Sequence, residues 1–144
     1  MTAEQIFSIA NLLALGGWLI IIFLPRWFTA DRFIIGVIIT LLSFAYLALI
    51  IKTFNLKDFS GFSSLNGVMA LFSDPWLLLA GWIHYLAFDL LTGLFISKNA
   101  AKQGIRHIYI IPSLLLTFML GPLGLLVYLI MRWMITKNYF EENF

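Results

Sequence analysis

Long runs of apolar residues, separated by short polar segments, dominate the chain. Four of these runs are about 20 residues long, which is enough for a helix to cross about 30 Å of hydrocarbon. They cover approximately Gln5–Leu24, Phe33–Ile51, Pro75–Ile96 and Ile108–Met131. The pattern therefore predicts an all-α integral membrane protein. We expect a four-helix transmembrane bundle that forms a single domain over residues 1–144.

The polar segments between the runs differ in length. The segments RWFTADR and SKNAAKQGIRH are short and favour antiparallel helix pairs on either side of each. The long segment between the second and third runs repeats apolar residues at helical spacing, namely Leu65, Val68, Met69 and Phe72. We expect a short interfacial helix near Ser63–Phe72, acting either as a structural plug or as a lid over a lipid-accessible cavity.

Composition narrows the classes of function. Only 11% of the residues are charged and the net charge is +2, so we expect no nucleic-acid partner. Cysteine is absent, which excludes disulfides and thiolate metal sites, and we expect neither a metal nor a cofactor. The N-terminus lacks a basic region before its apolar run, so this run is predicted to be a retained span. A small excess of Lys and Arg in the short loops predicts that these loops are cytoplasmic and both termini outside.

Two ionisable residues interrupt the third run, in the stretch WIHYLAFDLL. A carboxylate at the centre of a span costs at least about 2.5–3.5 kcal/mol, so Asp89 is a candidate functional residue, with His84 beside it. Counting residues from the helix ends places His84 at the depth of Asn11 and Ser43, and Asp89 at the depth of Thr117. We expect both side chains to point inward. They are about 140° apart around the helix, so they would flank one cavity rather than pair.

The fourth run carries small and polar residues at steps of three or four. They are Ser113, Thr117, Gly121, Gly124, Tyr128 and Arg132. Such a seam is typical of a face packed against another helix. Pro122 would bend this helix near Phe118, either as a consequence of packing alone or to shape a pocket.

Arg106 and His107 lie at the start of the fourth run, next to a short loop. We expect them at the membrane–water boundary, either as simple anchors or as ligands for a headgroup. His107 and His84 would differ in depth by about 18 Å, which excludes a single haem held by both.

The order of motifs W-x-H, D-L, R-H and G-P-x-G between Asp74 and Trp133 resembles the plant neoxanthin-synthesis family, called abscisic-acid-deficient-four-like, and its bacterial relatives. The resemblance implies an integral four-span protein associated with xanthophyll formation, in plants with the conversion of an epoxy-carotenoid to an allenic one. Because a plastid-targeting extension is absent, a bacterial member in the inner membrane is expected.

This resemblance suggests a cofactor-free carotenoid isomerase with a polyene or isoprenoid lipid as its partner. Protonated Asp89 would serve as the acid and neutral His84 as the base. Substrate contacts are expected from the aromatic side chains of the third run and from two polar side chains, namely Trp82, Tyr85, Phe88, Asn11 and Thr117.

Two other classes of function stay open. The protein could bind pigment or membrane lipid without catalysis, or act as a scaffold for a biosynthetic complex or a homo-oligomer. A small transporter is a third reading, although it requires inverted repeats or a continuous polar path, whereas the polar residues here form layers.

Overall fold

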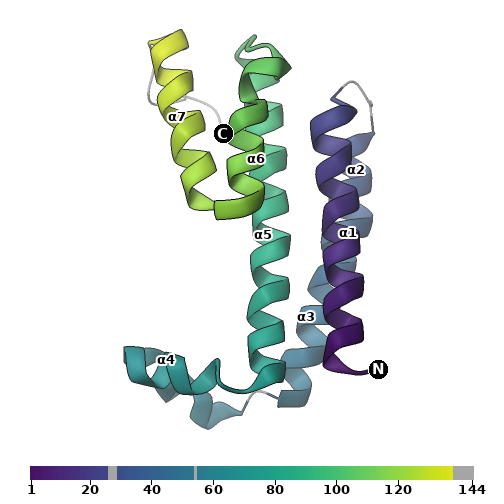
Figure 1. Cartoon of the computed structure of the whole chain (residues 1–144), viewed down its shortest axis with the longest axis vertical. Helices are drawn as coiled ribbons and strands as arrows, with labels where there is room; N and C mark the ends of the chain where they lie inside the picture. Colours follow the sequence, from purple (N-terminus) through teal and green to yellow (C-terminus); the bar gives the residue numbers. More distant parts are fainter. Residues whose placement is uncertain (26–28, 54, 138–144) are drawn as a thin grey trace.

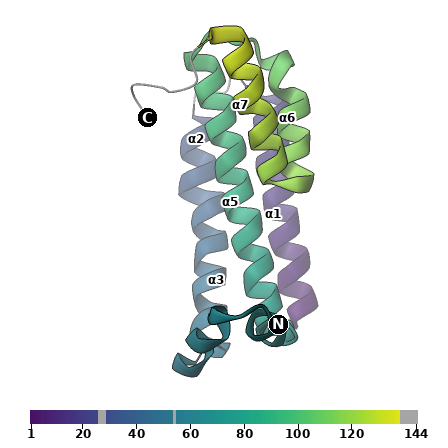
Figure 2. The same ribbon diagram turned by 90° about the vertical axis from the view of Figure 1, so that its left-hand side faces the viewer.

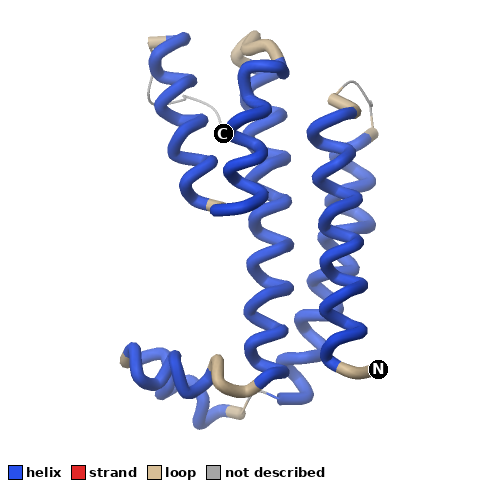
Figure 3. Tube along the Cα trace, viewed as in Figure 1, coloured by secondary structure: helices blue, strands red, loops and turns tan. Residues whose placement is uncertain are grey.

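The computed structural model describes the backbone of residues 1–25, 29–53 and 55–137, and the side chains of these residues except 56–59. Every regular element within these ranges is a helix (Figure 3). The predicted all-α class is therefore confirmed.

Three long helical segments form the body of the molecule. They are α1 (Ala3–Phe23), the continuous segment made of α2 (Ala30–Phe33), the π-helical η1 (Ile34–Ile39) and α3 (Thr40–Thr53), and α5 (Pro75–Lys102). All three are long and apolar enough to cross a membrane. They stand side by side, with α5 packed against both α1 and α3 (Figures 1 and 2). These segments correspond to the first three predicted runs.

Local capping explains where two of these helices begin. The Thr2 hydroxyl accepts a hydrogen bond from the Gln5 backbone N–H, and the Gln5 side chain accepts one from the Thr2 N–H, which closes a capping box at α1. The Asp74 carboxylate accepts hydrogen bonds from the backbone N–H groups of Trp76 and Leu77, and Pro75 occupies the first helical position of α5.

The fourth predicted span is not one helix. Its residues form two shorter helices, α6 (His107–Leu120) and α7 (Pro122–Thr136), which run in opposite directions beside one half of α5 (Figure 1). Helices of 14 and 15 residues are about 21–23 Å long, which is too short to cross about 30 Å of hydrocarbon. The expectation of a four-helix bundle is therefore wrong. Instead, the structure has three candidate spans, followed by a helical hairpin of α6 and α7. This hairpin begins and ends at the same end of the molecule.

Gly121 and Pro122 cause this reversal. Gly121 has φ 47° and ψ −101°, a backbone conformation that side chains strongly disfavour, and it ends α6. Pro122 has no N–H to continue the helix, but its fixed φ suits the first position of a new one. The predicted bend near Phe118 is thus a complete turn of the chain.

The seam of small and polar residues closes the hairpin on itself. A Cβ atom on Gly124 of α7 would overlap the backbone nitrogen of Thr117 and the carbonyl oxygen of Ser113 on α6. All three residues are buried. At Ser113, Thr117 and Gly124 the seam faces a helix, as predicted, but the partner is the other half of the same apolar run.

Two short helices lie across the end of the bundle that carries the N-terminus (Figure 2). They are η2 (Leu56–Ser63) and α4 (Leu65–Leu71), and the Ser64 hydroxyl caps α4 by accepting from the Gly67 N–H. The short helix predicted near Ser63–Phe72 is present.

The described chain begins and ends at opposite ends of the molecule. Its N-terminus lies at the end of the molecule that carries α4, whereas α7 ends beside the connection between α5 and α6 (Figure 1). The expectation that both termini share one side is wrong for the described residues, because the fourth run turns back halfway. Residues 138–144 lie outside the described residues.

The hairpin can be tested by side-specific labelling, because the native chain has no cysteine. We expect Gln103→Cys and Lys137→Cys to react with a membrane-impermeant maleimide from the same side of sealed vesicles, and Thr2→Cys to react from the other side. The cysteine-free parent is the control. Labelling of positions 2 and 137 from one side would restore the four-span topology.

The close approach of α6 and α7 makes a second prediction. Gly124→Ala should lower the free energy of unfolding by about 1–3 kcal/mol, because the added methyl group must push the two helices apart. Gly16→Ala is the matched control, since a Cβ atom there meets nothing within 4 Å and Ala is the better helix former. Thermal unfolding in detergent should show a lower Tm for Gly124→Ala alone.

Candidate functional site

An apolar pocket lies where α4 meets the long helices. We call it the α4 pocket, and its volume is about 460 Å³. Its lining comes from α3, η2, α4 and the first half of α5, and consists of Tyr46, Ile50, Phe62, Leu71, Phe72, Leu77, Ala80, Gly81 and His84. Apart from the Tyr46 hydroxyl and the His84 imidazole, these side chains carry no polar atom. The pocket therefore suits a hydrophobic ligand with few polar groups.

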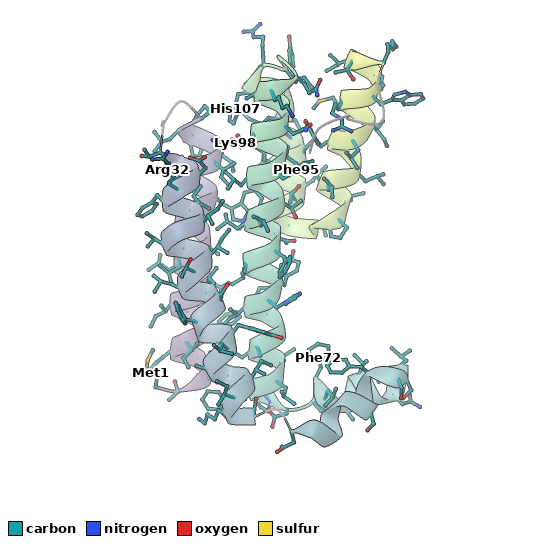
Figure 4. All side chains as sticks on the ribbon, turned by 180° about the vertical axis from the view of Figure 1, so that it is seen from behind. Met1, Arg32, Phe72, Phe95, Lys98 and His107 are labelled. Atoms are coloured by element: carbon teal, nitrogen blue, oxygen red, sulfur yellow. The ribbon has the colours of Figure 1, made fainter. Side chains whose placement is uncertain are left out.

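Phe72 ties the short helices to α5 at this pocket. A Cβ atom on Gly81 would approach the Phe72 ring to 2.6 Å, so the absence of a side chain at Gly81 is what lets this ring lie against α5. Figure 4 shows Phe72 between the end of α5 and α4. The Phe72 ring is therefore one contact that holds the α4 side of the pocket against α5.

His84 points into the α4 pocket and not into the interior of the bundle. Its side chain is exposed, its ring stacks on Phe88 at 4.5 Å between centroids, and the Tyr46 ring lies 5.7 Å away. Among the described residues it has no hydrogen-bond partner, and Ser43, predicted at the same depth, is exposed on α3. The expectation that His84 points inward is therefore wrong.

Asn11 of α1 contacts Trp82 of α5. The Trp82 indole N–H donates a hydrogen bond to the Asn11 side-chain oxygen at 3.0 Å, which joins α5 to α1. The Trp82 ring also lies 5.8 Å from Phe7 and 5.4 Å from Tyr85, between centroids. Trp82 is 40% exposed and Phe88 57%; Phe88 stacks on His84, whereas Trp82 lies on the side of α5 that faces α1.

Asp89 lies at the tip of the hairpin. Its side chain is only 8% exposed, and a Cβ atom on Gly121 would come within 2.8 Å of its Oδ1 atom. Oδ2 is buried and has no hydrogen-bond partner among the described residues. The inward orientation predicted for Asp89 is therefore observed, and a glycine at the tip is what leaves room for the carboxyl group.

Tyr85 connects this carboxyl group with the outside of the bundle. Its hydroxyl donates a hydrogen bond to the Met119 carbonyl oxygen at 3.3 Å and also interacts with Asp89. Its side chain is partly exposed. Tyr85 thus lies between the sealed carboxyl group and the surface that carries Trp82.

The structure does not bring His84 and Asp89 into a single cavity. His84 opens onto the α4 pocket, whereas Asp89 is enclosed between α5 and the hairpin tip. Thr117, the other polar residue expected at this depth, is 0% exposed and donates its hydroxyl to the Ser113 carbonyl oxygen at 2.8 Å. Its observed role is therefore to stabilise the hairpin.

Arg106 and His107 lie at the other end of the molecule, where Figure 4 labels His107 beyond Lys98. A ring nitrogen of His107, Nε2, is 2.9 Å from the Ile22 carbonyl oxygen near the end of α1, and Arg106 lies over the Tyr109 ring. Both residues line a second pocket of about 820 Å³ between the ends of α1, α5 and α6. The eighteen residues of α5 beyond His84 rise by about 27 Å, so the two histidines are far apart, as predicted.

A buried polar cluster near this end was not predicted. The Tyr128 hydroxyl donates to the Asn99 side-chain oxygen at 2.5 Å, and the Arg132 guanidinium donates to the same oxygen at 3.1 Å. The cluster ties α7 to α5. Tyr128 and Arg132 were recognised as part of the seam, but Asn99 was assigned to a loop because the predicted third run ended at Ile96.

Metal binding finds no support in the described part of the chain, where no three His, Asp or Glu side chains come together as ligands. The site consists of an apolar pocket, one imidazole, and a tyrosine in front of a buried carboxyl group.

These features define a helical membrane protein with an apolar pocket that lies beside polar groups at mid-depth. The chain belongs to the ABA DEFICIENT 4-like family, whose model matches residues 5–128. The family suspected from the motifs is therefore confirmed, and the match includes the first half of the chain. No curated protein and no solved structure matches the chain significantly.

Disruption of the buried cluster of Asn99, Tyr128 and Arg132 should lower the stability of the protein. Asn99→Leu removes the acceptor for both Tyr128 and Arg132, and should lower the free energy of unfolding by about 1–3 kcal/mol, because two buried donors lose that partner. Asn66→Leu, the same change at an exposed position of α4, is the control. Equal Tm values for both variants in detergent would contradict the structural role of Asn99.

Proposed function

We propose that the protein binds a carotenoid or a related isoprenoid within the membrane and rearranges its oxygenated end group without a cofactor. One observation carries the proposal. A buried carboxyl group, fronted by a tyrosine, lies about 7.5 Å along α5 from a histidine that opens onto an apolar pocket. Membership of a family related to neoxanthin synthesis supports a carotenoid as the proposed substrate class.

Binding rests on the shape and chemistry of the α4 pocket. Its volume of about 460 Å³ lies within the range of about 300–1,000 Å³ usual for small-molecule sites. A carotenoid is longer than this pocket, but the exposed rings of Trp82 and Phe88 extend the aromatic surface along α5. Flat rings of this kind pack well against a conjugated polyene.

The chemistry needs one acid and one base. Opening an epoxide breaks a carbon–oxygen bond and requires a proton on the oxygen, while a base removes a proton from a nearby carbon of the polyene. The electrons of the broken carbon–hydrogen bond form the new double bond, so the product is an isomer and no oxidant is consumed. The acid comes from the Asp89 side of α5 and the base is His84, whose ring has no hydrogen-bond partner among the described residues.

The proposed orientation follows from charge. In the described chain, two basic residues lie at the α4 end, Lys52 and Lys57. Six lie at the opposite end, namely Arg32, Lys98, Lys102, Arg106, Arg132 and Lys137. The positive-inside rule then places the short loops in the cytoplasm and the α4 end outside. The bacterial inner membrane stays a prediction.

The pigment profile of a carotenoid-producing host tests the function. Expression of the wild type in a host that supplies an epoxy-carotenoid should yield an isomeric product, and pigment should co-purify with the protein. His84→Ala and Asp89→Asn should lower turnover by about 10²–10⁴-fold at matched membrane levels, because each removes a proton-transfer group. Ser43→Ala, an exposed polar position on α3, is the control.

Two other results would contradict the proposed function. Identical profiles for the wild type and both variants, with pigment still bound, would replace catalysis by pigment binding or scaffolding. Purified protein without any carotenoid would refute the proposed ligand class and favour transport of another substrate.

A further inference from the structure

The Asp89 side chain is only 8% exposed and lies behind the hairpin tip, which restricts direct contact with a ligand. Gly121 lies against its Oδ1 atom, and its Oδ2 atom is buried. A proton that leaves this carboxyl group for a substrate in the membrane therefore needs an intermediate group.

Tyr85 has the position that such a group requires. It precedes Asp89 by four residues on the same face of α5, so the two side chains are neighbours. It is partly exposed, and its ring lies against Trp82 on the open surface. Its hydroxyl therefore lies between the sealed carboxyl group and the surface proposed to hold the polyene.

The Tyr85 hydroxyl makes only a long hydrogen bond to the tip of the hairpin. Met119 is one of the last residues of α6, and the chain turns at Gly121, so no later turn of the helix donates to its carbonyl oxygen. The Tyr85 hydroxyl donates to that oxygen at 3.3 Å, near the long limit for a hydrogen bond between oxygens. A rotation of the hydroxyl would exchange this long hydrogen bond for one to a ligand oxygen.

We propose that Tyr85 is the catalytic proton donor, which touches the oxygen of the isoprenoid end group, and that Asp89 is a positioning residue that acts through it. The inference rests on the proposed function and specifies its acid. It replaces direct contact between Asp89 and the substrate by a relay of two side chains.

The proton balance of the relay closes over one turnover. The Tyr85 O–H bond breaks as the carbon–oxygen bond of the epoxide opens, and the new hydroxyl keeps that proton. Protonated Asp89 returns a proton to the tyrosinate and becomes a carboxylate. His84 gains the proton removed from carbon and later releases it at the open α4 pocket. The Asp89 carboxylate regains one proton through the Tyr85 hydroxyl, so one proton is lost and one gained and the starting state is restored.

The test compares three variants of the purified, full-length protein in lipid nanodiscs. They are Tyr85→Phe, Asp89→Asn and the control Tyr109→Phe, which deletes the same hydroxyl group from an exposed tyrosine of α6. The probes are violaxanthin, which carries epoxides, and β-carotene, which carries no oxygen. Quenching of tryptophan fluorescence measures binding, pigment separation measures turnover, and the Tm checks folding.

For Tyr85→Phe we expect turnover of violaxanthin to fall by about 10²-fold or more, as for the loss of a general acid. Its Kd for violaxanthin should rise by up to about tenfold, because one hydrogen bond is lost, while the Kd for β-carotene stays unchanged. Asp89→Asn should lower kcat and leave KM for violaxanthin unchanged, a separation that a general loss of packing would not produce.

The outcomes separate the two proposals. Tyr85→Phe with the turnover of the wild type would overturn the relay and leave the proposed function standing. If Tyr85→Phe does not fold, Asp89→Asn decides, and unchanged kcat in that variant would overturn the relay. A wild type that binds neither carotenoid, or binds violaxanthin without converting it, would refute catalysis and the relay together.

Discussion

The reversal of the chain at Gly121 is the constraint on which the rest of the structure depends. Only a residue without a side chain adopts φ 47° easily, and only such a residue fits against the Asp89 carboxyl group. The reversal stops the hairpin halfway along α5. It therefore both creates the polar tip and leaves the first half of α5 to face the α4 pocket and the surrounding lipid.

A helix end inside a bilayer has a cost that explains the polar residues around it. Backbone groups without partners are expensive in hydrocarbon, and each helix end leaves several of them. The Tyr85 hydroxyl serves one such group, the Met119 carbonyl oxygen. At the other end of the hairpin, Asn99 binds Tyr128 and Arg132 and so holds α7 to α5. Tyr85 and Asn99 of α5 are thus placed where the hairpin needs polar partners.

Hydropathy and the helical spacing of apolar residues were sufficient to predict the three long helices and the short helix near α4. They could not predict the hairpin, because one continuous span and two half-length helices have the same apolar composition. The Gly-Pro pair was the available signal, and it was read as a kink. Residue counts along α5 give depth but not direction, so Asp89 was placed correctly in the interior while His84 was not. Direction depends on where the neighbouring helices stop, which only the fold specifies.

A purely structural role explains Tyr85 better than it explains Asp89. The tyrosine satisfies a carbonyl oxygen that would otherwise lie unpaired, so packing alone accounts for it. The carboxyl group beside it keeps one buried oxygen without a partner among the described residues, at a cost that a smaller or apolar side chain would avoid. Buried ionisable groups that are poorly satisfied concentrate at functional sites. The energetic cost of Asp89, and not its polarity alone, is therefore the strongest argument that the hairpin tip takes part in chemistry.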